Sequence, residues 1–159
     1  MNHGEKLAYL AGIIDGEGSI MIYFNHTTNR FTLMIKVSNT SKELVDWLYE
    51  NFQGAKYSIN PPSKLVHKQW KQQYVWEVRS FETLPFLIEL YPFLVIKRKQ
   101  CEIAMEFRKT FGHKKCPLPK EIWDVRHELY KQMRHLNFRG LTVPPSCPSA
   151  LSSEEFEVN

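Results

Sequence analysis

Residues 7–20, LAYLAGIIDGEGSI, join an apolar helix to two acidic residues that stand among glycines where the helix should end. Apolar residues recur at helical spacing along one face, at Leu7, Leu10 and Ile14. A second face carries small residues and one acid: Ala8, Ala11, Gly12 and Asp15. A helix that is apolar on more than one side packs against more than one neighbour. We therefore expect another helix to pack against the small-residue face.

The acidic residues Asp15 and Glu17 fall at the end of this helix. The C-terminus is the negative end of the helix dipole, so a carboxylate there is normally unfavourable. A divalent cation removes this cost, and Mg²⁺ prefers oxygen ligands, including carboxylates and phosphate oxygens. One chain offers too few carboxylates for a complete site. The DGEG segment therefore predicts half of a metal site, which two copies would complete by pairing this helix about a two-fold axis.

Two segments with alternating polarity follow. In residues 30–38 the apolar side chains of Phe31, Leu33, Ile35 and Val37 alternate with polar ones, which predicts a strand with one buried face. Residues 19–25 alternate in the same way. A capping-box pattern at residues 40–43 predicts the start of a helix that ends near residue 52.

A second pair of strands is predicted from residues 56–60 and 74–79. In the first of these, Tyr57 and Ile59 are expected in the core. Helices are expected at residues 82–90, from Pro92 to Gly112, and from Pro119 to about residue 137. The predicted fold class is α+β, with an αββαββα core, a four-stranded antiparallel sheet and additional C-terminal helices. We expect one domain over residues 1–140 and a loose tail over 141–159.

Basic residues are separated from acidic ones along the chain. The net charge is only +4, but residues 18–42 and 51–76 contain seven lysines and arginines and no aspartate or glutamate. A polar sheet face can simply be solvated. The lack of acids on nearly the whole outer face instead favours a polyanionic partner, because lysine, arginine, asparagine and glutamine bind phosphates and base edges.

The general composition is that of a soluble globular protein, with 43% hydrophobic and 24% charged residues. No apolar run is long enough to span a membrane, and no targeting signal is visible. Three cysteines without close spacing suggest reduced thiols and an intracellular location. A zinc site at His113 and Cys116 lacks partners at zinc-binding spacing.

Residues 10–18, LAGIIDGEG, closely resemble the LAGLIDADG motif of homing endonucleases. The order of elements is similar to that family's core, and residues 92–100, PFLVIKRKQ, resemble its basic stretch after the second hairpin. The resemblance covers residues 5–140. Glu17 departs from the more common aspartate, and its longer side chain changes the geometry of a metal site.

The resemblance implies roles for individual residues. Glu17 would bind metal, with the Gly16 carbonyl as a second ligand, and Asn39 and Lys97 would complete the catalytic set. Alternatively, Asn39 caps the following helix and Lys97 is a surface cation. Ala8, Ala11, Gly12 and Asp15 would form the dimer interface. Mg²⁺ is the expected ion; Mn²⁺ or Ca²⁺ can occupy such a site, with no turnover expected for Ca²⁺.

The implied function is a homodimeric endonuclease that cuts both strands of a long pseudo-palindromic DNA site, since only one motif is present. The alternative is an intron-encoded maturase that binds its host intron RNA. The candidate DNA-binding residues are Met21, Tyr23, Asn25, Arg30, Thr32, Met34, Lys36, Ser38, Lys56, Ser58, Asn60, Lys64, Lys68, Lys71, Gln73, Val75, Glu77, Arg98 and Lys99.

Overall fold

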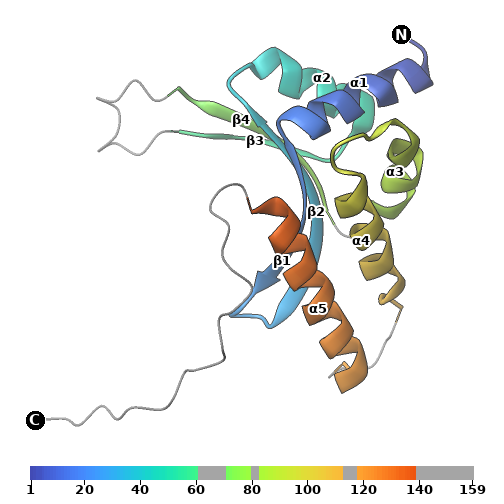
Figure 1. Cartoon of the computed structure of the whole chain (residues 1–159). Helices are drawn as coiled ribbons and strands as arrows, with labels where there is room; N and C mark the ends of the chain where they lie inside the picture. The colour runs from blue at the N-terminus through green and yellow to red at the C-terminus, as the bar shows by residue number, and fades with distance from the viewer. Residues whose placement is uncertain (61–70, 80–82, 113–117, 139–159) are drawn as a thin grey trace, which may run out of the picture.

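The computed structural model describes residues 1–60, 71–79, 83–112 and 118–138, which form one twisted sheet with helices packed on it (Figure 1). The elements are α1 (His3–Gly16), β1 (Gly18–Asn25), β2 (Arg30–Asn39), α2 (Lys42–Phe52), β3 (Ala55–Ile59), β4 (Gln73–Arg79), α3 (Thr83–Leu90), η3 (Tyr91–Phe93), α4 (Arg98–Lys109) and α5 (Lys120–Asn137). This order confirms the predicted α+β class and the αββαββα core. The predicted tail at residues 141–159 lies outside the described residues.

The sheet has the strand order β1-β2-β4-β3, and all neighbouring strands are antiparallel. The β1–β2 pair and the β3–β4 pair therefore meet through β2 and β4 at the centre. In this register Ile35 of β2 lies between Ile20 of β1 and Val78 of β4. The β3–β4 pair extends away from α3 and α4, so β3 is an edge strand with little helical cover (Figure 1).

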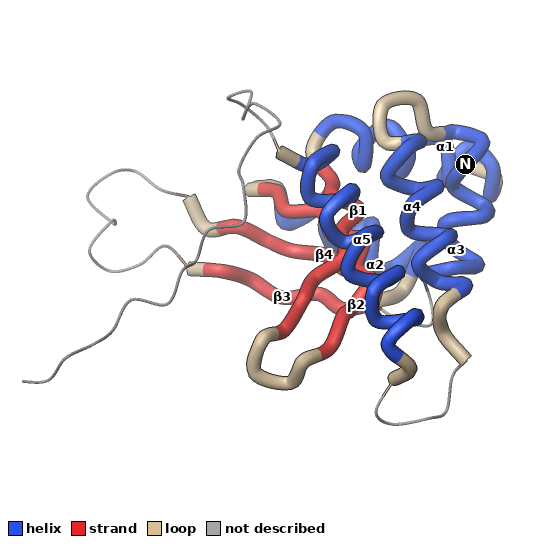
Figure 2. Tube along the Cα trace, turned by 60° about the horizontal axis from the view of Figure 1, so that its bottom comes forward, coloured by secondary structure: helices blue, strands red, loops and turns tan. Residues whose placement is uncertain are grey.

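The core lies between the helices and one face of the sheet. Phe31, Leu33, Ile35 and Val37 are buried there, as their alternation predicts. Helices α3, α4 and α5 contribute Leu87, Phe107 and Met133 to the same cluster, and Figure 2 shows α1, α3 and α4 side by side. Fully burying one such large apolar side chain stabilises the fold by about 1.5–3 kcal/mol. The opposite face of the sheet, which we call the open face, carries the side chains that alternate with these core residues along each strand.

Two predicted boundaries are wrong. Ser41, and not Thr40, caps α2, since its hydroxyl group accepts a hydrogen bond from the Leu44 N–H group. The single helix expected from Pro92 to Gly112 is interrupted, because η3 ends at Phe93 and α4 begins only at Arg98. The interruption at residues 94–97 has a tertiary cause, described with the site below.

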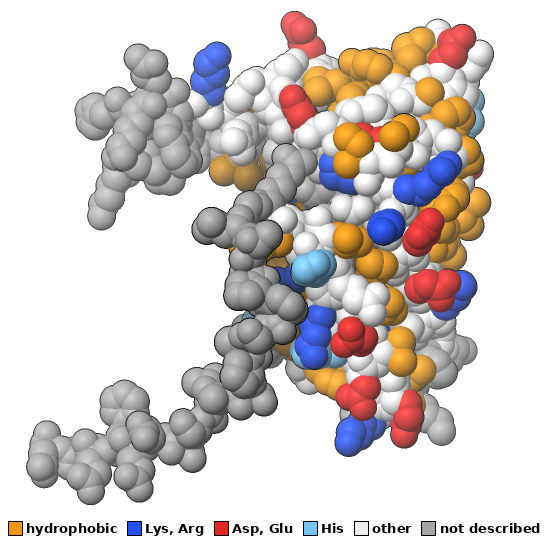
Figure 3. Space-filling view, in the orientation of Figure 1, with side chains coloured by type: hydrophobic (Ala, Val, Ile, Leu, Met, Phe, Trp, Pro, Cys, Tyr) orange, Lys and Arg blue, Asp and Glu red, His pale blue; other side chains and the backbone are white. Residues whose placement is uncertain are grey.

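No helix in the described part of the chain is long and apolar enough to cross a membrane. Over the helical side of the molecule, acidic and basic side chains are interspersed (Figure 3). This mixture of charges differs from residues 18–42 and 51–76, which contain basic residues and no acidic ones.

Candidate functional site

Glu17 is the C-cap of α1 and is exposed to solvent. Its N–H group donates to the Ile13 carbonyl oxygen over 2.8 Å, which fixes the backbone at the helix end. The next residue, Gly18, begins β1, and a Cβ atom there would lie 2.6 Å from the Ile14 Cα atom. Only glycine therefore lets the strand leave so close to the helix. Gly18 thus allows Glu17 to lie directly before the start of β1.

Asn39, at the end of β2, contacts Glu17 from the neighbouring strand. Its side-chain amide donates a hydrogen bond to the Glu17 carboxylate. Its side-chain oxygen accepts the Ser41 N–H group over 2.8 Å, just before α2. Asn39 therefore bonds both to Glu17 and to Ser41, the residue that caps α2, so it is not itself the helix cap. Its catalytic role stays a prediction. The second carboxylate oxygen of Glu17 makes no hydrogen bond within the described residues.

Asp15 is buried and bonds to its own chain. Its carboxylate accepts the N–H groups of Val95, Ile96 and Lys97 over 2.8, 3.2 and 2.9 Å. Burial alone would raise the pKa of the Asp15 carboxyl group, but these donors and the Lys97 ammonium group together hold that pKa below its ordinary value. The expectation that Asp15 pairs two copies is wrong in this respect. Its bonds also explain why η3 and α4 do not form one helix.

Lys97 is held by the same residue. Its side chain is only 5% exposed, and its Nζ atom donates to the Asp15 carbonyl oxygen over 2.5 Å. The ammonium group therefore lies beside the last turn of α1, two residues before Glu17. Lys97 is not one of three equivalent surface cations, since its neighbours Arg98 and Lys99 are exposed.

Glu17 and Lys97 line one cavity of about 490 Å³. It is lined by Glu17, Gly18, Ser19, Met21, Ile96, Lys97, Gln100, Leu136 and Asn137. Gln100 was not predicted as a site residue. It is 8% exposed, and its side chain makes no hydrogen bond within the described residues. The sequence signal that could have found it is its place one helical turn after Lys97.

Comparisons with known proteins bear on the fold. No family model matches the sequence, and no curated protein matches it either. Among solved structures, the archaeal intron-encoded homing endonuclease I-Vdi141I, complexed with DNA, is similar with a TM-score of 0.70 and 16% identity over 90% of this chain and 91% of that one. The chain has the LAGLIDADG homing endonuclease fold.

Two further structures share this fold. The homing endonuclease I-CvuI, bound to DNA in the presence of Mg, has a TM-score of 0.67 and 16% identity, with 89% of this chain and 88% of that chain covered. The LAGLIDADG homing endonuclease I-GzeII, in complex with its DNA target, has a TM-score of 0.64 and 15% identity. In that match 94% of this chain covers 54% of the other, so this chain spans about half of the longer protein.

On α1 of this fold, the structure separates the predicted interface residues into two groups. Ala11 is fully buried in the core of its own chain, so assigning it to the dimer interface is wrong. Ala8 and Gly12 are exposed, and a Cβ atom at Gly12 would meet no atom within 4 Å. Residue 11 faces the sheet because α1 covers the core, whereas residues 8 and 12 lie one helical turn apart on its outer side.

The open face carries the residues of β1, β2 and β4 that alternation predicted. A hollow of about 430 Å³ lies on it, lined by Tyr23, Asn25, Thr28, Arg30, Thr32, Met34 and Arg79. Lys36 and Ser38 are partly exposed, and Gln73 and Lys71 are exposed. Arg79 was omitted from the predicted contacts, although its alternation with Glu77 indicates the same face.

Three predicted contacts on β2 and β4 are less accessible than expected. Met34 is 9%, Val75 0% and Glu77 3% exposed. They lie on the open face, as the register with Arg79, Ser38 and Lys36 shows, but neighbouring side chains cover them. Proposing Val75 and Glu77 as direct DNA contacts is therefore wrong, since they offer almost no accessible surface. Met34 lines the hollow described above, so its contact with DNA stays a prediction.

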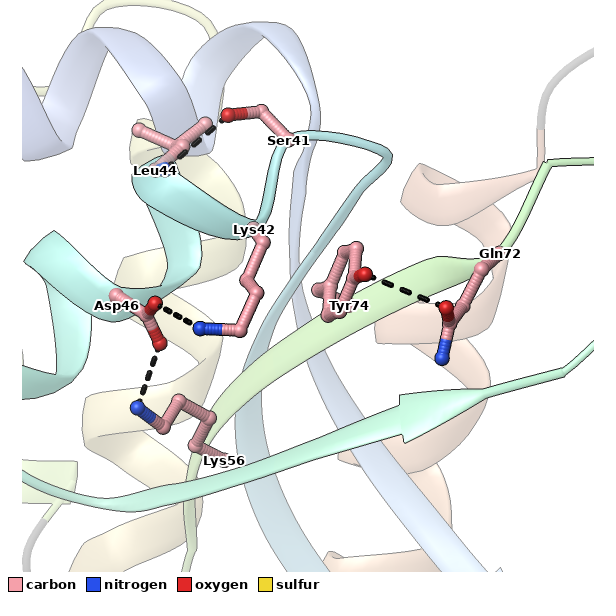
Figure 4. A network of polar contacts seen from close by, with 7 residues as sticks. All are labelled: Ser41, Lys42, Leu44, Asp46, Lys56, Gln72 and Tyr74. Atoms are coloured by element: carbon pink, nitrogen blue, oxygen red, sulfur yellow. Dashed lines mark hydrogen bonds and ion pairs between the residues drawn. The ribbon is translucent and has the colours of Figure 1, made fainter.

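The prediction of which β3 side chains lie on the open face is wrong. Lys56 and Ser58 are paired with Trp76 and Tyr74, so they lie on the helix side of the sheet. Lys56 Nζ lies 2.6 Å from the Asp46 carboxylate of α2, as Figure 4 shows. Asn60 follows the end of the strand, and Tyr57 and Ile59 lie on the open face instead. Every residue of this edge strand is exposed, so no core imposes an alternation that the sequence could display.

The remaining predicted contacts divide simply. Arg98 and Lys99 are exposed at the start of α4, next to Lys97. Lys64 and Lys68 lie outside the described residues, as do His113 and Cys116.

Burial raises the pKa of the Cys101 thiol to about 12, so this thiol is protonated at neutral pH and is not a nucleophile.

Proposed function

We propose that this chain is a homodimeric, Mg²⁺-dependent endonuclease that cuts double-stranded DNA at a long pseudo-palindromic site. The observation that carries the proposal is the cavity shared by Glu17 and Lys97, at the edge of a sheet face with exposed Arg30 and Arg79 and partly exposed Lys36. Within the described residues of that face, the acid Glu77 is buried and bonded to Arg79. The proposed site of action is a cellular compartment that holds the target DNA.

The donors at the end of α1 fit a hard divalent cation. Glu17 offers a carboxylate oxygen without a hydrogen bond inside the described residues, and Gly16 offers a main-chain carbonyl oxygen beside it. No group of three or more histidine, cysteine, aspartate or glutamate side chains within the described residues could enclose a metal. The ligand set of one chain therefore needs phosphate oxygens and a second copy. When bound, such a cation acidifies water and stabilises charge on the phosphodiester.

The residues of the chain have separable tasks in this proposal. Glu17 supplies negative charge for the cation, and Asn39 fixes the orientation of its carboxylate. Lys97 supplies a positive charge at a fixed position, where it stabilises the phosphate oxygens as bonds break. The basic side chains of the open face hold the duplex by its phosphates and base edges.

Dimerisation supplies the second cutting site. One chain carries one Glu17, and two DNA strands must be cut. Ala8 and Gly12 leave the outer side of α1 open for close contact with a second helix. The length of I-GzeII, of which this chain spans about half, supports a working unit built from two such folds. A two-fold dimer would recognise two related half-sites.

The test is cleavage of a plasmid that carries the uninterrupted form of the host gene, with Mg²⁺ or with EDTA. The wild-type chain should linearise the plasmid only with Mg²⁺. Glu17→Gln should abolish cleavage while DNA affinity stays within a few-fold, because it removes a metal ligand and leaves the open face intact. Glu50→Gln, an exposed carboxylate on α2, is the matched control and should cut normally.

Two results would overturn the proposal. Cleavage by Glu17→Gln at the wild-type rate would remove Glu17 from the metal site. Absence of any Mg²⁺-dependent cleavage by the wild-type chain, together with acceleration of host-intron splicing in vitro, would establish the maturase alternative instead.

A further inference from the structure

Glu77, Arg79 and Tyr57 form a bonded group on the open face. Arg79 Nη2 lies 2.5 Å from Glu77 Oε1, and the Tyr57 hydroxyl group donates to Glu77 Oε2 over 3.1 Å. Glu77 and Arg79 are two residues apart on β4, so their side chains share one face of the sheet. Tyr57 reaches the same carboxylate from β3.

The Glu77 carboxylate is committed to this group. Its side chain is 4% exposed, and each of its oxygens has a partner. A carboxylate in the major groove can accept a hydrogen bond from cytosine, but a buried and doubly bonded one cannot reach a base. Burial, followed by the bond to Glu77, raises the pKa of the Tyr57 hydroxyl group, so Tyr57 remains a donor.

Arg79 is the charged member of the group that remains accessible. Its side chain is 55% exposed, and it lines the hollow of the open face together with Arg30 and Thr32. A guanidinium group has five N–H donors in a fixed plane, so bonding to Glu77 leaves donors for a ligand. The side chain of Arg30, on the same hollow, makes no ion pair or hydrogen bond within the described residues. The two arginines therefore differ in how firmly they are held before a ligand arrives.

We propose that Arg79 determines base specificity by recognising a guanine in the major groove, and that Glu77 and Tyr57 position it. This inference rests on the proposed DNA-binding function. Arginine binds guanine O6 and N7 through two parallel hydrogen bonds, and a side chain that is already oriented loses less entropy on binding. Because Glu77 balances its charge, Arg79 adds less to salt-dependent phosphate attraction than Arg30 or Lys36 does.

The experiment measures binding to every single-base-pair variant of the target, at several salt concentrations. Arg79→Lys keeps the positive charge beside Glu77 and loses the planar fork, so it should fold normally. Its preference for G·C should fall about 10- to 100-fold at one base pair in each half-site, with preferences elsewhere unchanged. Thermal unfolding of each variant checks that the fold is intact.

Glu77→Gln gives a signature that a purely structural role would not produce. It keeps an acceptor for Tyr57 and adds one net positive charge to the open face. Preference at the base pair that Arg79 recognises should weaken. Affinity for unrelated DNA should increase, and this affinity should decrease more steeply as the salt concentration is raised. Arg30→Lys is the matched control. If it changes specificity, the change should occur at a different base pair from that of Arg79, and specificity at that base pair should not change in Glu77→Gln.

Three outcomes would overturn the inference. A uniform loss of affinity across all variants of the site in Arg79→Lys would make Arg79 a phosphate contact. An unchanged specificity profile in a folded Arg79→Lys variant that still cuts DNA would refute the role of Arg79 while the proposed function stands. Failure of the wild-type chain to prefer any DNA sequence would refute both.

Discussion

The ammonium group of Lys97 donates a hydrogen bond to the main-chain carbonyl oxygen of Asp15 over 2.5 Å, although 82 residues separate them. In return, the Asp15 carboxylate accepts the Lys97 N–H group over 2.9 Å. The start of α4 is thereby fixed to the end of α1. This contact sets a buried cation beside Glu17, on the wall of the same cavity.

Replacing Lys97 by methionine should reduce the cleavage rate about 100- to 1,000-fold, because one fixed charge that stabilises the phosphate is lost. DNA affinity should change little, since Lys97 is buried and many exposed cations remain. Single-turnover cleavage and equilibrium binding measure the two quantities separately. Lys99→Met, at the exposed neighbouring position, should leave the rate intact, and an equal loss of rate there would argue against a special role for Lys97.

Replacing Asp15 by asparagine should lower the free energy of unfolding by about 1–3 kcal/mol, because three N–H groups lose a charged acceptor. Urea denaturation of the two proteins at neutral pH measures the difference. The residues that Asp15 holds should also become more open to hydrogen exchange, first at Val95 and Ile96. Wild-type protection at these two amides in the variant would show that other contacts hold the interruption between η3 and α4.

Replacing Gly12 by leucine should give a folded monomer. Within one chain the new side chain meets no atom near its Cβ position, and leucine favours a helix over glycine by up to about 1 kcal/mol. In a dimer paired through α1, the same side chain would separate the helices and the two Glu17 carboxylates, so double-strand cleavage should be lost.

Sedimentation velocity measures the oligomeric state of Gly12→Leu, and Gly12→Ala is the smaller control substitution. A stable dimer of the leucine variant with full cleavage activity would show that the outer side of α1 is not the interface.

The two lysines on opposite faces of the sheet should behave differently. Lys36→Ala should weaken DNA binding, either uniformly with a shallower salt dependence or by about 1–3 kcal/mol at a single base pair. Lys56→Ala should leave binding unchanged, because Lys56 bonds to Asp46 on the helix side (Figure 4). Affinities across single-base variants at several salt concentrations make the comparison. An equal loss in both variants would place β3 against the DNA after all.

The sequence by itself predicted the elements that bury one face. In β2, apolar residues alternate with polar ones because helices cover one side of the strand. The apolar residues on that side are Phe31, Leu33, Ile35 and Val37, and their period-two spacing is visible in the sequence. The motif at residues 10–18 likewise indicated Glu17 as an exposed carboxylate at the end of α1. These predictions succeeded because each depends on a local pattern that burial or a glycine requirement imposes.

Tertiary structure decided what local pattern does not encode. The edge strand β3 has no core beside it, so its sequence pattern does not indicate which side chains lie on which face of the sheet. The predicted faces of Lys56 and Tyr57 are therefore wrong. The interruption before α4 depends on Asp15, a residue distant in sequence whose carboxylate binds three N–H groups. The site has the same origin: local sequence supplied Glu17, Asn39 and Lys97, but only the packing of α1 against β2 and against residues 95–97, just before α4, brought them together.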